Sequence, residues 1–267
     1  MEAHTRPLAV VTGASSGIGL ELAKLFAAAG FDLVVAAEDD HIHAVADGIR
    51  ASGVDAEAVQ VDLAMEDGVA DLYRRVTRPA DALALNAGIG AGGAFVSSET
   101  RETYLRDELK LIDVNVRSTV HVAKLLLPDM VARGSGRVLF TSSIASTMPG
   151  SFQAVYNASK SFVQSFALAL REELKDTGVT VTSLMPGPTD TEFFERADML
   201  ETKVGAGEKD DPAEVARDGF EAMMAGREQI VSASLSTRAQ GRFDRFVPER
   251  LKAQMHRRMA EPGSARK

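Results

Sequence analysis

Short apolar runs alternate along the chain with longer segments in which apolar residues recur every three or four positions. The short runs are rich in Val and Leu, as in buried β-strands, and the longer segments have the periodicity of amphipathic helices. We predict strands at Leu8–Gly13, Phe31–Ala37, Ala56–Leu63, Ala80–Gly88, Gly136–Ser143, Val179–Gly187 and Gln229–Ser232. We predict helices at 17–30, Glu66–Val76, Glu102–Ala132, Phe152–Asp176 and from Pro212 to about Ala225.

Strands that alternate with helices predict a mostly parallel sheet with helices on both faces. No linker, low-complexity tract or repeat interrupts the pattern, and 267 residues are enough for one large domain with a substantial core. We therefore expect one doubly wound α/β domain over residues 1–237. Residues 238–267 are expected to form a basic, amphipathic helical appendage.

Composition narrows the class of protein. The chain has no cysteine, which excludes disulfides and thiolate metal sites and favours the reducing cytosol. The formal net charge of −8 argues against a nucleic-acid binder. No stretch approaches the roughly 18 apolar residues of a membrane span, and the first apolar run is too short for a signal peptide. We expect a cytoplasmic protein that binds small molecules, with no nucleic acid and no stable membrane insertion.

A glycine-rich loop, TGASSGIG at Thr12–Gly19, joins the first predicted strand to the first helix. Its three glycines permit a tight turn, close approach of the backbone to a pyrophosphate, and close packing of helix on strand. The helix N-terminus adds free N–H groups for the phosphates. A glycine-rich turn without a ligand is the simpler alternative, but the position after the first strand favours a Rossmann-type dinucleotide loop. The cofactor contacts expected here are Gly13, Ser15, Ser16, Gly17, Ile18 and Gly19.

The same loop also fits G-x-S-x-G, the nucleophile elbow of α/β-hydrolases, with Ser15 as the nucleophile. The elbow should follow several strands, whereas only one predicted strand precedes this loop. Of the five histidines, only His256 lies late enough in the chain to complete a triad. We therefore favour the dinucleotide loop and keep the hydrolase as a minor alternative.

Three acids, Glu38, Asp39 and Asp40, follow the second predicted strand. Glu38 lies close to the offset of about 20 residues at which an acid hydrogen-bonds the adenosine ribose of a dinucleotide. A carboxylate there would repel a 2′-phosphate, and no cation is near in the sequence. The alternative is an acidic N-cap for the next helix. We expect NAD to be preferred on the order of a hundredfold, with NADP as the alternative if an arginine from elsewhere serves it.

The sequence YNASK at Tyr156–Lys160 contains Y-x-x-x-K, a pair that arises by chance in roughly one such chain in ten. It is accompanied by Ser143 at a strand end, Asn115 in DVNVRST, NAG at Asn86–Gly88 and PGPTDT at Pro186–Thr191. In this order, the motifs resemble the short-chain dehydrogenase/reductase family from about residue 8 to residue 191. The acidic AEDD and the LNAG motif are less typical of that family.

This resemblance implies a catalytic tetrad of Asn115, Ser143, Tyr156 and Lys160, in which Lys160 also holds the cofactor ribose. It implies further cofactor contacts at Asp62 and Leu63 for the adenine, at Asn86, Ala87 and Gly88 for the cofactor floor, and at Pro186, Gly187, Thr189 and Thr191 around the nicotinamide. Asn115 would bind a water that relays protons towards Lys160. A fully paired buried amide is the alternative for Asn115.

Elementary chemistry agrees with these roles. Tyr156 and Lys160 are four residues apart on a predicted helix and therefore share a face. A free tyrosine has a pKa near ~10, and we expect a neighbouring cation and the oxidised nicotinamide to lower that pKa. Ser143, at the carboxyl end of a strand, can hydrogen-bond a substrate oxygen as its charge changes.

Two further features carry weaker signals. His41 and His43 are two residues apart and do not share a helix face, so we predict no metal site. From Arg238 the chain carries nine Lys/Arg and three Asp/Glu. A stripe at helical spacing is formed by Phe243, Val247, Leu251, Met255 and Met259. The stripe either lies on an anionic membrane or packs on protein, and the second is more usual. We expect a homo-dimer or homo-tetramer.

The sequence thus predicts an NAD-dependent oxidoreductase that interconverts a secondary alcohol and a ketone, with Tyr156 as general acid/base. The substrate pocket is expected to be lined by Gly90–Phe95, Ile144–Gln153 and the segment after Thr191. Its Met and Phe side chains favour a hydrophobic substrate. A non-catalytic dinucleotide-binding sensor with the same fold is the alternative from another class.

Overall fold

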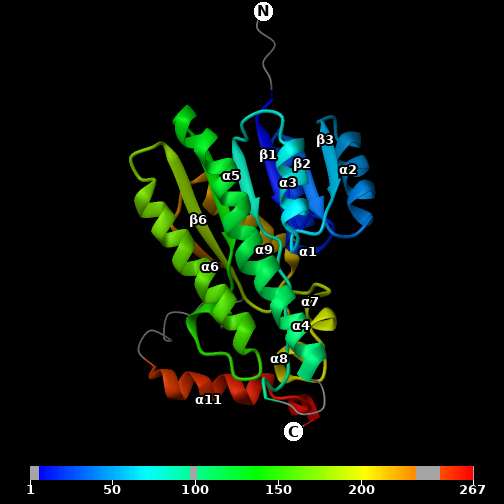
Figure 1. Cartoon of the computed structure of the whole chain (residues 1–267), viewed down its shortest axis with the longest axis vertical. Coiled ribbons are helices and arrows are strands. Elements are labelled where there is room, and N and C mark those ends of the chain that lie inside the picture. The colour runs from blue at the N-terminus through cyan, green and yellow to red at the C-terminus, as the bar shows by residue number, and fades with distance from the viewer. Residues whose placement is uncertain (1–5, 97–100, 233–246, 267) are drawn as a thin grey trace, which may run out of the picture.

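The computed structural model describes residues 6–96, 101–232 and 247–266, with the backbone alone for 101–104. Its strands are β1 Leu8–Thr12, β2 Asp32–Ala37, β3 Ala56–Gln60, β4 Ala82–Leu85, β5 Gly136–Thr141, β6 Val179–Pro186 and β7 Gln229–Ser232. They form a parallel sheet in the order β3-β2-β1-β4-β5-β6-β7 (Figure 1). The predicted doubly wound Rossmann-type fold is confirmed.

Helices lie on both faces of this sheet (Figure 1). The described helices are α1 Gly17–Ala28, α2 His41–Ala51, α3 Glu66–Arg75, α4 Arg101–Ile112, α5 Ser118–Arg133, α6 Ala154–Glu173, α7 Phe193–Arg196, α8 Lys203–Ala206, α9 Pro212–Met224 and α11 Glu249–Ala260. Apolar side chains of α1, α2 and α9 pack on one face. Those of α3, α5 and α6 pack on the other.

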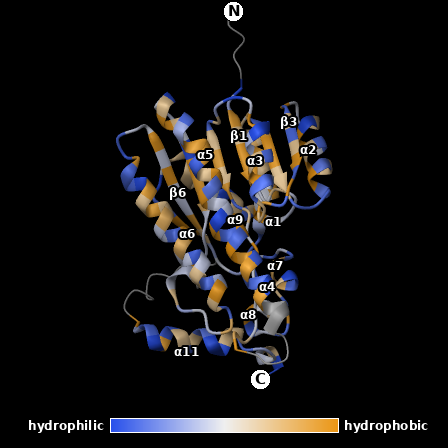
Figure 2. Ribbon diagram, viewed as in Figure 1, coloured by the Kyte–Doolittle hydropathy of each residue, from blue (hydrophilic) through white to orange (hydrophobic). Residues whose placement is uncertain are grey.

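Side chains of β1 alternate between the two resulting cores. Ala9 and Val11 belong to the cluster under α1, whereas Leu8 and Val10 belong to the cluster under α3, α5 and α6. Because both faces of the sheet are covered, the strand is apolar throughout rather than at every second position. Figure 2 shows the same division, with apolar strands inside and polar positions along the outer helices.

The segment predicted as helical over Glu102–Ala132 is helical throughout, but it contains a π-helical turn that the prediction did not include. Helix α4 ends at Ile112, and a π-helical turn, η1 Asp113–Arg117, precedes α5. The hydroxyls of Ser118 and Thr119 donate back to the carbonyls of Val114 and Asn115, a contact that bends helices. The turn holds Asn115 in the interior, where its side chain is almost completely buried.

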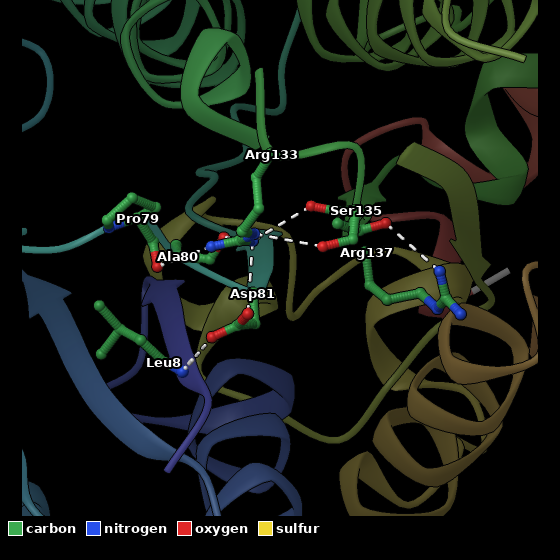
Figure 3. A network of polar contacts seen from close by, with 8 residues as sticks. Leu8, Pro79, Ala80, Asp81, Arg133, Ser135 and Arg137 are labelled. Carbon is green, nitrogen blue, oxygen red and sulfur yellow. Dashed lines mark hydrogen bonds and ion pairs between the residues drawn. The ribbon is translucent and has the colours of Figure 1, made fainter. Parts of the chain in front are cut away.

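A polar network fixes the amino ends of three neighbouring strands, far from their carboxyl ends (Figure 3). One oxygen of Asp81 accepts a hydrogen bond from the backbone N–H of Leu8 at 2.7 Å. The other lies 3.3 Å from a guanidinium nitrogen of Arg133. Arg133 also donates to the carbonyls of Ala80 and Ser135. These contacts tie the starts of β1, β4 and β5 together, which holds the register on which the opposite end depends.

The carboxyl ends of the strands face α7, α8 and α11 (Figure 1). Phe194, Ala197 and Met199 form a small apolar cluster there with Ala260 of α11. The C-terminal segment therefore folds back onto the end of the sheet at which a doubly wound fold binds its ligands.

Helix α11 contacts the rest of the chain through a face that the apolar stripe does not predict. Its buried residues are Lys252, His256 and Ala260, whereas Leu251 and Met255 are exposed. Phe243 lies outside the described residues. Packing of the stripe on a second subunit stays a prediction. Within the described ranges, no helix is both long enough and apolar enough to cross a membrane.

Candidate active site

A cavity of about 370 Å³ lies where the carboxyl ends of β1, β4, β5 and β6 meet. It brings together residues that are far apart in the sequence. Those of the sequence-predicted site that line it are Gly13, Ser15, Ser16, Gly17, Ile18, Glu38, Asp62, Leu63, Asn86, Ala87, Gly88, Ser143, Tyr156, Lys160, Pro186, Gly187, Thr189 and Thr191. Gly19 and Asn115 do not line the cavity, and both support it from behind.

The glycines of the loop after β1 are required by close contacts. A Cβ atom on Gly19 would lie 1.9 Å from the carbonyl oxygen of Gly13, and one on Gly13 would lie 2.8 Å from the Cα of Ala87. Gly13 and Gly17 also have positive φ angles of 65° and 54°, which disfavour other residues. The backbone therefore forms an open cradle at the N-terminus of α1, a shape that fits a dinucleotide pyrophosphate.

Asn86 and Thr12 connect three strand ends beneath this cradle. The Thr12 hydroxyl accepts hydrogen bonds from the backbone N–H groups of Asn86 and Ala87, each at 3.0 Å. The Asn86 amide donates to the carbonyls of Thr12 and Gly13, and its oxygen accepts from Thr141. In the LNAG motif, the asparagine thus holds β1, β4 and β5 at a fixed spacing.

Tyr156 and Ser143 face each other across the cavity from α6 and the end of β5. Burial is the main influence on the phenol and raises the pKa of Tyr156 to about 12. The Ser143 hydroxyl also acts on the Tyr156 phenol and, taken alone, lowers its pKa. The expected lowering of that pKa by Lys160 is therefore absent from the protein alone. At neutral pH the phenol keeps its proton.

Lys160 lies one turn after Tyr156 on α6, and its side chain is buried. The ammonium group donates to the carbonyl of Thr141 at 3.0 Å. Burial lowers the pKa of Lys160 to about 8, because the charged form loses its water. A Cβ on Gly88 would lie 3.0 Å from this ammonium group, so the glycine leaves it open to the cavity.

Asn115 forms three hydrogen bonds with the protein. Its side-chain oxygen accepts from the backbone N–H of Ile89 at 2.9 Å, and its nitrogen donates to the carbonyl of Ile89 and to the Ser159 hydroxyl. Both amide hydrogens take part in these bonds, as expected if Asn115 is a fully paired buried amide. Only the second lone pair of the side-chain oxygen is left for a water, so a part in proton relay stays a prediction.

A family model described as short chain dehydrogenase matches residues 7–201. The chain belongs to this family. A short chain dehydrogenase of Pseudocercospora fijiensis is 33% identical over 199 residues, which cover 73% of this chain and 63% of that protein. The match thus spans less than two thirds of that relative's length. The family is one of oxidoreductases, as the resemblance predicted.

Two solved structures of dehydrogenases share the fold closely. A short-chain dehydrogenase from Sphingobium yanoikuyae in complex with NADPH is 29% identical, with a TM-score of 0.78 over 88% of this chain and 91% of that one. A bulky-bulky ketone specific alcohol dehydrogenase from Comamonas testosteroni is 25% identical, with a TM-score of 0.75 over 91% and 92%.

The hydrolase alternative finds no geometric support. The Ser15 hydroxyl donates to a carboxylate oxygen of Asp39 at 2.7 Å, and no histidine nitrogen within the described ranges contacts this hydroxyl. His41 instead bonds the backbone carbonyl of Ser15, and His43 lies against Gln60. Among the described residues, no group of three His, Cys, Asp or Glu side chains is placed to hold a metal ion.

The acidic strand end has a cationic partner that the sequence analysis missed. Glu38 lines the cavity, and its carboxylate lies 2.8 Å from the ammonium group of Lys110 on α4. Hydrogen bonding to Glu38 is the main reason that the pKa of Lys110 is raised. The expectation that no cation is near Glu38 is therefore wrong. The two residues are 72 positions apart, and the helical pattern of α4 gave no sign of the contact.

The cavity also has an apolar part. Its lining includes Met148, Phe193, Phe194 and Val204, which come from two of the three segments predicted for the substrate pocket. The Phe193 ring lies 5.1 Å from the Tyr156 ring, between centroids.

Gln153 lies at the end of a segment predicted for the pocket and lines the cavity, whereas the sequence analysis missed His256 and Met259 of α11 as lining residues. The four-residue spacing of Lys252, His256 and Ala260 was the available signal.

Proposed function

We propose that this short-chain dehydrogenase interconverts a secondary alcohol and a ketone with NAD(H), and that Tyr156 is its general acid/base. The observation that carries the proposal is that Ser143, Tyr156 and Lys160 line one cavity together with the glycine-rich loop. A substrate oxygen placed against both hydroxyls receives a hydrogen bond from each. When bound, the nicotinamide cofactor supplies or accepts the hydride.

Each side chain then has a defined task. Ser143 donates to the substrate oxygen and stabilises charge on it as the carbon gains or loses hydride. Tyr156 gives its proton to that oxygen in reduction and takes it back in oxidation. Lys160, four residues away on the same face, holds positive charge near the phenol and reaches the ribose side of the cavity.

With a pKa of about 12, the Tyr156 phenol is protonated at neutral pH and can act as the general acid in reduction. Reduced nicotinamide is uncharged and leaves the phenol protonated, as a general acid must be. Oxidised nicotinamide carries a positive charge that lowers the pKa of a neighbouring phenol, as a base requires. The same buried tyrosine thus suits either direction, according to the cofactor present.

The apolar part of the cavity supports a hydrophobic substrate. Met148, Phe193 and Phe194 offer little compensation to a polar ligand that must leave water. The related Comamonas testosteroni enzyme is described as specific for bulky-bulky ketones, which is consistent with this class.

For the cofactor, we propose NAD, with a smaller preference over NADP than the sequence suggests. Glu38 and Asp39 line the cavity and would repel a 2′-phosphate. Lys110 partly neutralises Glu38 and can turn towards such a phosphate. A single exposed charge is worth about 1 kcal/mol, so we expect the preference to be about tenfold rather than about a hundredfold.

The cofactor proposal is tested by kcat/KM with NADH and with NADPH. Lys110→Ala should strengthen the preference for NADH severalfold, and Glu38→Ser should weaken or invert it. A matched control is Lys24→Ala, since Lys24 forms a similar exposed ion pair with Glu21. A wild-type enzyme that prefers NADPH would contradict the assignment of Glu38.

The reaction is tested with NADH deuterated at the reactive carbon and a panel of aryl and branched alkyl ketones. Wild-type protein should consume the cofactor and transfer one deuterium to the carbinol carbon. Binding of NADH without consumption by any ketone, and binding of NAD without consumption by the matching alcohols, would support a non-catalytic sensor instead.

A further inference from the structure

Helix α11, near the end of the chain, contributes side chains to the lining of the cavity. In Figure 1 it lies below the carboxyl ends of the strands, beside α8. Lys252, His256 and Ala260 are spaced four apart and form its buried face. Of these, His256 lines the cavity, together with Met259 from the next turn.

The contacts of α11 fix it against the loop that follows β5. The Lys252 ammonium donates to the carbonyl of Thr147 at 3.2 Å. The Ser151 hydroxyl donates to the carbonyl of Ala253 at 3.0 Å. Nδ1 of His256 bonds the carbonyl of Ser151 at 2.9 Å. Two segments about 100 residues apart are thus joined at three points along one helix face.

The loop that α11 packs against also contains a residue in a strained backbone conformation. Phe152 has a φ of 66°, in a region that a bulky residue adopts only when its surroundings hold it there. Its carbonyl accepts from the backbone N–H of Gly93, and its ring lies 5.5 Å from the Arg257 guanidinium. His256 therefore sits in a position set by contacts on both sides, as a recognition residue requires.

These contacts define the state of the His256 ring. The Ser151 carbonyl can only accept, so Nδ1 must carry a proton. Burial is the larger influence and lowers the pKa of His256, so the ring is neutral at physiological pH and Nε2 has a free lone pair. Within the described ranges, Nε2 has no hydrogen-bond partner.

Nε2 of His256 offers a hydrogen-bond acceptor to a ligand beside several apolar side chains of the lining. Met148, Phe193, Phe194 and Val204 provide no hydrogen-bonding side chain in the apolar part of the cavity. The neutral ring gives an anion nothing to pair with, and it gives an ammonium group no counter-charge for the water that it loses. A hydroxyl donates one hydrogen bond at little cost in desolvation and matches a lone pair.

We propose that His256 is a substrate-recognition residue whose Nε2 accepts a hydrogen bond from a hydroxyl group on an otherwise apolar substrate. This hydroxyl is a second polar group of the substrate, distinct from the oxygen that Tyr156 and Ser143 contact. The assignment rests on the proposed function for its substrate class. It gives the C-terminal segment, which lies beyond the matched family region, a direct part in specificity.

The test uses benzylacetone and its ortho-, meta- and para-hydroxyphenyl analogues, bound to the NADH complex and measured by titration calorimetry. At least one hydroxylated ketone should bind wild-type protein about tenfold more tightly than benzylacetone. His256→Asn keeps an amide near the position of Nδ1 but has no acceptor at Nε2, so it should remove that difference. His256→Gln places an acceptor near Nε2 and should restore most of it.

A second measurement uses the wild-type protein alone and so does not depend on whether a His256 variant folds. In ¹⁵N-labelled wild-type protein with NADH, the Nε2 resonance of His256 should move when the preferred phenol is added and stay unchanged with benzylacetone. Equal affinity of wild-type protein for all four ketones, or an unchanged preference in His256→Asn, would overturn the proposal. NADH consumption, followed separately by absorbance, distinguishes this failure from failure of the proposed reaction.

Discussion

Replacement of Lys160 by methionine should change how stability depends on pH. Burial lowers the pKa of this lysine from 10.5 to about 8. Below pH 8 both the folded and the unfolded chain carry the proton, and the folded state bears the full cost of a buried charge. As pH rises from about 8 towards 10.5, the folded chain releases the proton while the unfolded chain retains it. Stability therefore rises with pH in this window.

The magnitude follows from the two pKa values. A lowering from 10.5 to about 8 corresponds to roughly 3 kcal/mol in all, of which about 2.5 kcal/mol accrues between pH 7 and pH 10. In Lys160→Met this contribution is missing. The wild type should therefore gain about 2.5 kcal/mol relative to the variant over that range. Loss of the hydrogen bond from Lys160 to Thr141 should lower the free energy of unfolding of the variant by a similar amount at every pH. It therefore has little effect on how the difference between wild type and variant depends on pH.

The assay is urea unfolding at pH 7, 8, 9 and 10, followed by far-UV circular dichroism because the chain has no tryptophan. Lys110→Met is the matched control. The ammonium group of Lys110 is partly exposed and has a raised pKa. The difference in free energy of unfolding between Lys110→Met and wild type should therefore stay constant up to pH 10. Parallel curves for wild type and Lys160→Met would refute the argument that burial depresses the pKa of Lys160.

Two further predictions concern the cradle. Gly19→Ala puts a methyl group 1.9 Å from the Gly13 carbonyl oxygen. It should lower the free energy of unfolding by more than about 2 kcal/mol and abolish NADH binding. The control is Gly48→Ala, in open space on α2, which should be neutral or slightly stabilising in the same unfolding assay. Thr12→Val leaves the N–H groups of Asn86 and Ala87 without their acceptor and should cost about 2 kcal/mol, whereas Thr12→Ser should cost less than half of that. An equal loss for Val and Ser at Thr12 would contradict the role given to its hydroxyl.

The strand and helix pattern predicted the fold because local periodicity reflects burial on a layered sheet. β1 and β2 are apolar at nearly every position because both faces are covered, and this signal needs no knowledge of their neighbours. The π-helical turn at Asn115 was missed since it inserts into a continuous helical pattern. The hydroxyls of Ser118 and Thr119 bond carbonyls within this turn, and the apolar periodicity does not indicate such bonds.

The candidate site was predictable where motifs are short and local. The glycine loop and the pair Tyr156 and Lys160 each lie within a few residues, so spacing alone constrains them. Glu38 with Lys110, and His256 with Ser151, join segments about 70 and 100 residues apart. Such pairs depend on the packing of whole helices against the sheet. The raised pKa of Tyr156 likewise depends on its burial in the folded chain, which the motif does not specify.

The central claim, that Tyr156 moves the proton, is tested most directly by Tyr156→Phe. With a ketone that the wild type reduces, kcat should fall to about 1% or less, because the substitution removes one hydroxyl and no other atom. The affinity for NADH, followed by its fluorescence, should stay within about threefold, and the exposed Tyr73→Phe should behave as wild type. A Tyr156→Phe enzyme that retains more than a tenth of the wild-type kcat would contradict the account.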